Sequence, residues 1–267
     1  MTSILSKICD YKKEFIDHRK KVFPESEIIK NLDNRYIKRD FKLAIDKNYH
    51  NNNISIIAEI KRASPSKGII VNDFDPKRIA LSYEKGGATC ISVLTDEKYF
   101  LGNDKNLTIV RKNCLLPIIR KDFIISEYQI YESKYIGADC ILLIHSILDK
   151  FKIIEFYKLA KELKLDVLIE VHNQEELDNV SEMEGVLIGI NNRNLNTMKV
   201  HLNNSINIKN KLKSDINLIC ESGIGSIDDI KTLLKFKFRT FLIGEYLMRC
   251  DKPDKALNDI FQLNKKE

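Results

Sequence analysis

Four charged residues are the strongest candidates for chemistry, because each stands at the carboxyl end of an apolar run: Lys61, Lys121, Glu170 and Glu221. A single charge in such a place usually marks exposure to solvent, but four of them, two of each sign, are harder to explain as scaffolding. Lysines and glutamates gathered in one site could donate and remove protons, because their surroundings can push their pKa values apart. A lysine could also bind an anion or form a Schiff base.

The first of these lysines belongs to the block Ile56–Gly68, which reads IIAEIKRASPSKG. Alternate side chains of a strand share a face, so Glu59 and Lys61 project the same way. The turn that follows offers the hydroxyls of Ser64 and Ser66 together with further ammonium groups. We expect the strand to end in a polar site and the turn to be suited to an anion.

The second lysine lies in the block Pro117–Phe123, which reads PIIRKDF. Lys121 shares its face with Ile119, so it points inward if the apolar residues do. The competing interpretation is a salt bridge between Lys121 and its neighbour Asp122.

A carboxylate follows in the run Val167–Val171, where Glu170 shares its face with His172. A carboxylate across a barrel mouth from a lysine makes an acid–base pair. We interpret His172 as a surface or supporting imidazole rather than a catalytic one, and we interpret His145 in the same way.

The block Gly189–Leu195 reads GINNRNL and ends another apolar run. Asn191 and Arg193 are neighbours on one face of this strand end. An amide can orient a carboxylate, and a guanidinium can bind an acid. We interpret Asn192 and Asn194 as residues of an Asn-rich turn.

The last two runs end in glycine-containing turns, Glu221-Ser222-Gly223 and Gly244-Glu245. Glycines leave backbone N–H groups accessible, and a short helix that begins nearby would direct its positive end at an anion. Loops in these positions form the phosphate site of many α/β barrels. We therefore expect an anion site here, closed by the two serines of the first loop.

The elements that must position these residues are eight short apolar runs: Ser55–Ile60, Thr89–Leu94, Leu116–Ile119, Cys140–Ile144, Val167–Val171, Val186–Ile190, Asn217–Cys220 and Thr240–Ile243. Such runs are typical of strands buried on both faces of a parallel sheet. Helix-like segments alternate with them, including Pro76–Lys85, Ser126–Tyr135, Leu148–Leu163 and Asn173–Glu184. The alternation predicts an α/β fold, a (β/α)8 TIM barrel whose carboxyl-end mouth carries the chemistry. A doubly wound open sheet is the competitor, disfavoured because no Gly-x-Gly-x-x-Gly or Walker-type loop is present.

An N-terminal helical extension precedes the barrel. Apolar residues at helical spacing predict an amphipathic helix from about Ile4 to Ile16, and a second from Asn34 to Asn48. The polar stretch Tyr49–Asn53 would connect them to the first strand. We expect one domain over residues 1–267, with a helical cap (1–53), the barrel (54–250) and a C-terminal helix (251–267).

Composition narrows the possible partners. Lys and Arg outnumber Asp and Glu by 44 to 38, but the excess is spread along the chain, without an arginine-rich arm or zinc-finger spacing. We therefore expect no nucleic-acid partner, whereas a small anionic substrate would profit from the positive field. The N-terminus has no apolar signal core and no run is long enough to span a bilayer. Six cysteines without a Cys-x-x-Cys pair indicate reduced thiols and a cytoplasmic protein without disulfides or a zinc site.

Read together, the blocks resemble indole-3-glycerol-phosphate synthase in its monofunctional form, from about Ile4 to Met248. The similarity runs through IAEIKRASPSKG, ISVLTDEKYFLG, IIRKDFIISEYQI, LIEV, GINNRNL, ESGI and FLIGEYLM. The resemblance implies decarboxylation and dehydration of 1-(2-carboxyphenylamino)-1-deoxyribulose 5-phosphate to indole-3-glycerol phosphate, a step of tryptophan biosynthesis. It implies no metal or organic cofactor, and other enzymes of that pathway are candidate partners.

The resemblance also implies roles for the catalytic residues. Lys121 would be the general acid that assists ring closure and loss of the hydroxyl, and Glu170 the general base of the later proton removal. Lys61 would hold the substrate carboxylate, and Glu59 and Asn191 would orient the lysines and the reacting hydroxyls. The residues that the resemblance assigns to substrate binding are Ser64, Phe100, Phe123, Arg193, Glu221, Ser222, Gly223, Gly244 and Glu245. Within that set, the two phenylalanines would form the flat apolar slot for the anthranilate ring.

Two positions depart from the family's pattern. Asn194 replaces an aspartate that is common in its turn, and Tyr246 stands where a small residue is common. Two alternatives remain open: another phosphate-binding barrel enzyme, such as phosphoribosylanthranilate isomerase, or an inactive barrel that acts as a binding protein. The first needs no site for a departing carboxylate, so Lys61 discriminates against it.

Overall fold

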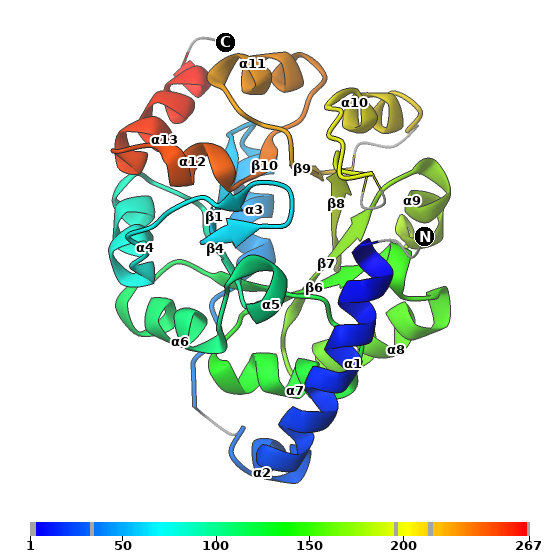
Figure 1. The fold of residues 1–267 in the computed structure, drawn as a ribbon. Helices are drawn as coiled ribbons and strands as arrows, with labels where there is room; N and C mark the ends of the chain where they lie inside the picture. Colours follow the sequence, from blue (N-terminus) through cyan, green and yellow to red (C-terminus); the bar gives the residue numbers. More distant parts are fainter. Residues whose placement is uncertain (1–3, 33–34, 195–196, 213–215, 266–267) are drawn as a thin grey trace.

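The fold is a closed barrel of eight parallel strands wrapped by helices (Figure 1). The computed structural model describes residues 4–32, 35–194, 197–212 and 216–265. Each barrel strand pairs with its neighbours in chain order, and the first closes on the last. The strands are β1 (Ser55–Ile60), β4 (Cys90–Leu94), β5 (Ile118–Lys121), β6 (Cys140–Ile144), β7 (Asp166–Val171), β8 (Leu187–Asn191), β9 (Leu218–Glu221) and β10 (Thr240–Ile243). The predicted (β/α)8 barrel is confirmed.

Helices connect the strands on the outside of the barrel. They are α4 (Pro76–Lys85), α5 (Glu97–Phe100), α6 (Asp104–Asn113), α7 (Glu127–Ile136), α8 (Lys150–Glu162), α9 (Gln174–Val180), α10 (Asn203–Lys209), α11 (Ile227–Lys235), α12 (Glu245–Arg249) and α13 (Pro253–Phe261). The predicted bounds of α4 are confirmed. Its proline occupies the first turn, and the Asp75 carboxylate accepts hydrogen bonds from two backbone N–H groups there. The helix predicted over Asn173–Glu184 is shorter in the structure, where α9 ends at Val180.

Two apolar layers follow from the alternation of side chains along each strand. Inward-facing residues such as Ile57, Ile119 and Leu168 fill the barrel interior. Their neighbours, such as Ile56 and Ile118, pack against the helices in a larger outer layer. Because every strand is buried on both faces, the runs in the sequence are continuous rather than alternating.

The N-terminal extension covers both ends of the barrel. It forms α1 (Ile4–Val22), α2 (Glu25–Lys30) and α3 (Phe41–His50). In Figure 1, α1 runs down to α2 at the bottom, whereas α3 lies behind β1. The buried side chains of α3, Phe41 and Ile45, pack with the inward-facing residues of the barrel. The N–H of Lys42 donates to Asp166, the first residue of β7, so α3 closes the amino end.

The predicted helix Asn34–Asn48 is wrong at its start. Asn34 lies outside the described residues, and α3 begins only at Phe41. The residues just before it are not helical. There the N–H of Arg39 donates to Asp139 and the ammonium of Lys38 binds Asp166. The predicted connection Tyr49–Asn53 is also shorter, since α3 continues to His50.

Several strands extend one or two residues beyond their predicted ends. The third run was expected to end at Ile119, but β5 continues to Lys121. Asn191 and Glu221 likewise lie inside β8 and β9, paired in register with each other. Pairing to neighbouring strands carries the ladder into the polar residues, which a search for apolar runs leaves out.

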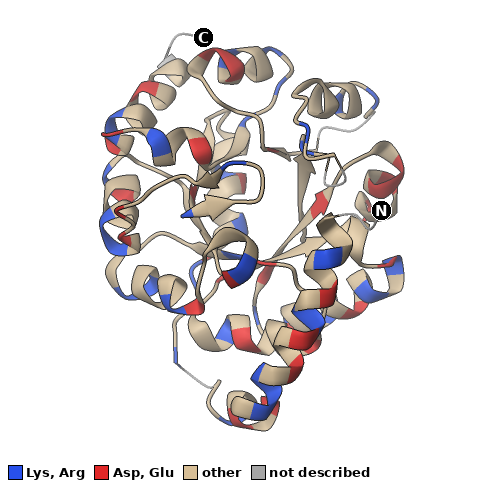
Figure 2. Ribbon diagram, in the orientation of Figure 1, with Lys and Arg blue, Asp and Glu red and all other residues tan. Residues whose placement is uncertain are grey.

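The outer surface carries mixed charge, with basic and acidic residues interspersed along the helices (Figure 2). No helix in the described ranges is long and apolar enough to cross a membrane.

Candidate active site

A cavity of about 1110 Å³ opens at the carboxyl end of the strands. The candidate residues from the sequence all line it: Glu59, Lys61, Ser64, Phe100, Lys121, Phe123, Glu170, Asn191, Arg193, Glu221, Ser222, Gly223, Gly244 and Glu245. Parallel strands in a closed barrel end at one mouth, which is why residues far apart in the chain meet here. We call five of its charged residues, those at the ends of β1, β5, β7 and β9, the mouth cluster: Glu59, Lys61, Lys121, Glu170 and Glu221.

Lys121 lies between two buried glutamates. Its Nζ is 3.2 Å from Oε2 of Glu170 and 3.6 Å from Oε2 of Glu221. The alternative pairing with Asp122 is wrong. Asp122 follows the last residue of β5 and binds Lys12 instead, at 2.6 Å.

Burial and neighbouring charges set the protonation of these three groups. Burial disfavours the ammonium of Lys121, but the charges of Glu170 and Glu221 outweigh it and raise the pKa of Lys121. Burial alone would raise the pKa of Glu170, but Lys121 and then His172 lower it below its usual range. Burial raises the pKa of Glu221 to about 8, although Lys121 opposes this. At pH 7 the site therefore holds a charged Lys121 beside an ionised Glu170, and Glu221 is the glutamate of this group that keeps its proton to the highest pH.

Glu170 is oriented by two partners. The Nδ2 of Asn191 donates to Oε1 of Glu170 at 3.0 Å. His172 Nε2 lies 3.4 Å from the same oxygen, while Nδ1 faces Glu176 at 3.3 Å. Burial would lower the pKa of His172, but its contacts with Glu170 and Glu176 raise it to about 10. His172 is thus a charged support for Glu170, as its interpretation from sequence expected.

Glu59 and Lys61 form a second pair at the end of β1, with 2.5 Å between Oε2 and Nζ. Gly244 makes room for both head groups. A Cβ at this position would lie 2.1 Å from Oε2 of Glu59 and 2.8 Å from Nζ of Lys61. Gly244 therefore has a packing role, in addition to the accessible backbone expected of it.

Gly189 is a site residue that sequence reasoning missed. It pairs with Glu170 in the β7–β8 ladder, and a Cβ on it would lie 1.9 Å from Oε1 of Glu221. The Glu221 carboxyl thus occupies the space above this glycine. The available signal was a glycine inside an otherwise aliphatic strand, which often marks close approach of another group.

The turn after β9 has a backbone conformation in which N–H groups can bind an anion. Ser222 and Gly223 both have positive φ, 62° and 86°. At Gly223 a side chain would also meet Val200, 2.6 Å from the Cβ position. Asn192, expected to be an ordinary turn residue, is instead buried and donates from Nδ2 to the carbonyls of Glu221 and Ser222. It holds this turn in its left-handed conformation.

Arg193 bridges two loops at the rim of the cavity. Its Nη1 donates to Oγ of Ser66 at 3.2 Å and to the carbonyl of Met198 at 3.1 Å.

Two residues depart from the pattern of the resembled family, Asn194 and Tyr246. Asn194 accepts a hydrogen bond from the N–H of Thr197 through Oδ1, an atom that an aspartate also has. Tyr246 lines the cavity and packs against the outer apolar layer. Leu195, the last residue of the block Gly189–Leu195, lies outside the described residues.

Two aromatic side chains line the same cavity. The rings of Phe100 and Phe123 lie 6.1 Å apart between centroids and are tilted by 39°. Apolar residues of α1, Ile4, Leu5 and Ile8, line the same cavity. The cavity thus has an apolar end beside α1 and a polar end at the strand tips.

Behind β5 lies a second group of charges, which we call the shell cluster: Lys12, Arg19, Asp96, Asp104, Arg120, Asp122 and Glu132. Arg120 precedes Lys121 and points the other way, into the helix layer. The sequence analysis did not identify this cluster, because its members come from four separate segments.

No three His, Cys, Asp or Glu side chains are grouped to hold a metal ion within the part of the chain that the structure describes. The arrangement offers proton transfer by lysine and glutamate, an anion-binding turn and an aromatic slot.

Comparison with known proteins places this site in context. The sequence matches the family described as indole-3-glycerol phosphate synthase over residues 5–260. It is 42% identical over 261 residues to the indole-3-glycerol phosphate synthase of Polaromonas naphthalenivorans, covering 98% of this chain and 99% of that protein. It is 44% identical over 260 residues to the enzyme of the same name from Legionella pneumophila (strain Lens), covering 97% and 99%. Among solved structures, tryptophan synthase subunit alpha from Legionella pneumophila matches with a TM-score of 0.63 at 12% identity, over 86% of this chain and 100% of that chain. That last likeness concerns the fold alone.

Proposed function

The chain belongs to the indole-3-glycerol phosphate synthase family, and we propose that it closes the indole ring in the cavity at the barrel mouth. It is a carboxy-lyase of tryptophan biosynthesis that acts on a small phosphorylated substrate. The substrate, 1-(2-carboxyphenylamino)-1-deoxyribulose 5-phosphate, has three parts: an aromatic carboxylate, a ketose and a phosphate. The cavity has a matching region for each.

Lys121 is the general acid of ring closure. The ring carbon that bears the carboxylate attacks the ketose carbonyl carbon, and the carbonyl oxygen takes a proton from the Lys121 ammonium. The carboxylate then leaves as CO₂, and its bonding electrons restore the aromatic ring. Lys121 is suited to this step because its two glutamate neighbours keep it charged before the reaction.

Glu170 is the general base of the dehydration that follows. Lys121, reprotonated from solvent, donates a proton to the new hydroxyl, which leaves as water. Glu170 removes the proton from the adjacent carbon, so that the indole double bond forms. The hydrogen bond from Asn191 and the charge of His172 hold Glu170 ionised and oriented. The contact that supports the whole assignment most directly is the 3.2 Å approach of Lys121 to Glu170.

The remaining residues bind the substrate. Lys61, held by Glu59, meets the departing carboxylate, and Arg193 lies on the same side. Phe100 and Phe123 enclose the anthranilate ring. The phosphate is bound by the loops that carry Ser64, Ser222, Gly223, Gly244 and Glu245, with backbone N–H groups as donors. The Glu245 carboxylate is paired with Arg249 at 3.0 Å.

We propose further that residues 1–267 form one domain, with the cap, barrel and C-terminal helix bounded at 53 and 250. The cover made by α1 and α3 supports a single domain, because Ile8 of α1 and Phe41 and Ile45 of α3 pack with the inward-facing residues of the barrel. We also propose that the protein acts in the cytoplasm beside other enzymes of the pathway.

The test is turnover by the purified protein. Conversion of the substrate to an indole-absorbing product is expected, with the rate unchanged by EDTA. Well-folded protein without turnover, or with a strict requirement for added metal, would overturn the proposal.

A further inference from the structure

Lys12 is a buried lysine on the N-terminal helix that the reaction does not use. Only 1% of its surface is exposed. Its Nζ lies 2.6 Å from Oδ1 of Asp122 and 3.0 Å from Oδ2 of Asp96. A buried ammonium is costly unless it is paired, so these two contacts are what allow Lys12 to be there.

Asp96 connects Lys12 to one side of the aromatic slot. It is the N-cap of α5, and its Oδ1 accepts a hydrogen bond from the N–H of Tyr99 at 2.7 Å. The helix that it caps has only four residues and ends at Phe100. The position of the Phe100 ring therefore depends on this cap and on the contacts of α5.

Asp122 connects Lys12 to the other side of the slot and to the general acid. It follows Lys121 directly, and its Oδ1 accepts a hydrogen bond from the N–H of Phe123 at 2.8 Å. Its Oδ2 accepts a hydrogen bond from the hydroxyl of Thr95 at 2.6 Å. One ammonium thus holds the carboxylates that fix both phenylalanines and the end of the strand that carries Lys121.

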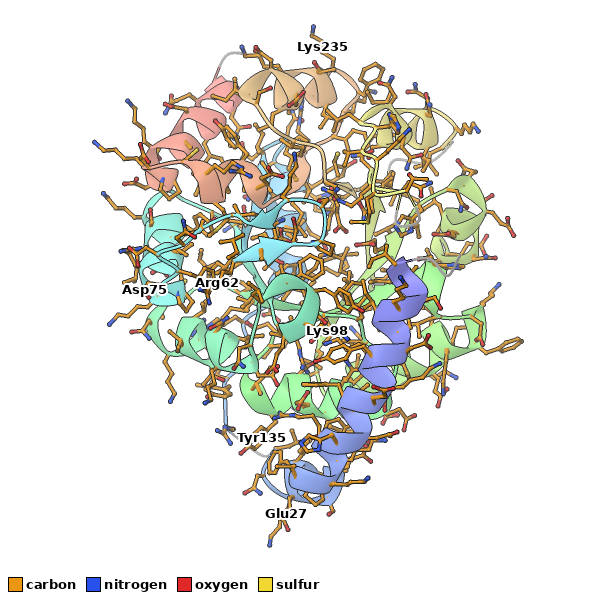
Figure 3. All side chains as sticks on the ribbon, viewed as in Figure 1. Glu27, Arg62, Asp75, Lys98, Tyr135 and Lys235 are labelled. Carbon is orange, nitrogen blue, oxygen red and sulfur yellow. The ribbon has the colours of Figure 1, made fainter. Side chains whose placement is uncertain are left out.

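Further contacts join α1 to α5 around this point. The hydroxyl of Tyr99 donates to the carbonyl of Lys7, and its ring meets that of Tyr11 at 6.0 Å. Lys98, labelled in Figure 3 beside α1, lies over the ring of Tyr11 at 4.4 Å. The two helices therefore pack together over the mouth, and Lys12 is a buried residue of this unit.

We propose that Lys12 is a positioning residue, which sets the aromatic slot and the Lys121 strand end through Asp96 and Asp122. The inference rests on the proposed function and deepens it. It makes α1 part of the catalytic geometry rather than only a cover of the barrel.

A purely structural role for Lys12 would be to fasten α1 to the barrel, and the chain offers a matched control for it. Arg19, on the same helix, binds Oε1 of Glu132 at 2.5 Å and Oδ2 of Asp104 at 3.3 Å. These partners lie on α7 and α6, and none of the three residues lines the cavity. Arg19→Met removes a fastening of α1 without touching Asp96 or Asp122.

The test compares Lys12→Met, Lys12→Arg and Arg19→Met with the unmodified protein. Lys12→Met should lower kcat by about 10- to 100-fold, since small displacements of reacting groups have effects of that size. Lys12→Arg, which keeps the charge, should restore a large part of kcat. Arg19→Met should keep kcat within about twofold. Equal loss of kcat in Lys12→Met and Arg19→Met would overturn the proposal.

Lys12→Met leaves two buried carboxylates beside each other, so a second variant separates positioning from failure to fold. In Lys12→Met/Asp96→Asn the asparagine can still cap α5, and Asp122 keeps Arg120 at 3.5 Å. In this double variant both substituted side chains are neutral. It should fold, and its kcat should remain below that of the unmodified protein. Recovery of normal kcat would show that Lys12 only balances charge, and would overturn the proposal.

Hydrogen exchange gives a measurement that does not depend on turnover. The amides of Tyr99 and Phe123 donate to the two carboxylates, so they should exchange faster in Lys12→Met than in the unmodified protein, and not in Arg19→Met. Unchanged exchange at both amides would contradict the positioning role. If the unmodified protein shows no turnover, the proposed function fails, while this measurement still decides whether Lys12 orders the two segments.

Discussion

The mouth cluster and the shell cluster lie back to back on β5, and they use the same kinds of residue to opposite effect. Arg120 and Lys121 are adjacent, yet one points into the helix layer and the other into the cavity. Alternation along a strand separates them. The comparison shows what distinguishes charges that stabilise a fold from charges that are available for a reaction.

The shell cluster is dense in hydrogen bonds. Arg120, with 1% of its surface exposed, donates to Thr95, Gln129, Ser133, Asp104 and Glu132. A guanidinium offers five N–H donors in a fixed plane, so a cluster built around it is rigid and specific.

The mouth cluster is less completely paired. The Oε1 of Glu221 is buried and accepts no hydrogen bond from the described residues. Three glutamates share two lysines there, which is why burial can raise the pKa of Glu221 to about 8. A lysine on a flexible stem and an unpaired carboxyl oxygen leave room for a substrate to complete the set of contacts.

Removal of Lys121 should have the largest effect on the mouth cluster. Lys121→Ala is expected to lower kcat by about 10²–10⁴-fold, the usual contribution of a general acid, with a smaller change in KM. Lys61→Ala should instead affect both kcat and KM, because it removes a contact with the substrate carboxylate. Steady-state kinetics of the two variants checks this. Near-normal kcat in Lys121→Ala, with inactive Lys61→Ala that still binds substrate, would exchange the two assignments.

Removal of Arg120 tests the shell cluster in the same way. Arg120→Met should lower the free energy of unfolding by about 3–5 kcal/mol, because it leaves buried carboxylates without their partner. Denaturant unfolding measures this loss. Arg78→Met is the matched control, since Arg78 and its partner Asp73 are both exposed, and the stability of this variant should hardly change. A similar small change in Arg120→Met would contradict the difference between the clusters.

A methyl group at Gly189 should disturb the mouth cluster without removing any charge. Gly189→Ala places a Cβ where Oε1 of Glu221 lies, so kcat should fall by about tenfold. Shortening the carboxylate side chain makes room again, and Gly189→Ala/Glu221→Asp should be more active than the product of the two single effects predicts. Strictly additive losses in this double-mutant cycle would argue against the clearance role of Gly189.

The smallest expected effect is on the pH dependence of stability. The pKa of Glu221 is about 8 in the folded protein and near 4.5 in the unfolded chain. Between these values the folded state keeps a proton that the unfolded state has released, so stability falls as pH rises. Relative to Glu221→Gln, the free energy of unfolding of the unmodified protein should fall as the pH rises from about 5 to 6.5. In the folded protein His172 stays charged over this window, because its pKa is raised to about 10. Parallel pH profiles for the two proteins would refute the raised pKa.

The amino-acid sequence alone was enough to predict the barrel and the residues at its mouth. Period-two alternation put Lys121 on the face of Ile119, and parallel strands brought the polar ends of all eight runs together. Both arguments are local or follow from topology. They need no knowledge of which side chain meets which, and so the candidate residues line one cavity.

The sequence could not supply the partners of those residues. Asp122, the neighbour of Lys121 in the chain, was the obvious partner for it. Asp122 instead binds Lys12, which precedes it by 110 residues. Lys121 binds the glutamates of β7 and β9. The start of α3 was misplaced for the same reason, because Lys38 and Arg39, which precede the helix, bind Asp166 and Asp139 from remote parts of the chain.

Tertiary structure decided these points because an ion pair depends on burial and on distances between segments remote in the chain. Local propensity carries neither quantity. The sequence therefore determined which end of the barrel is polar and which residues stand there. The contacts of Lys12 and Arg120 with buried carboxylates, and those of Lys121 with Glu170 and Glu221, decided which charges belong to the shell cluster and which line the cavity.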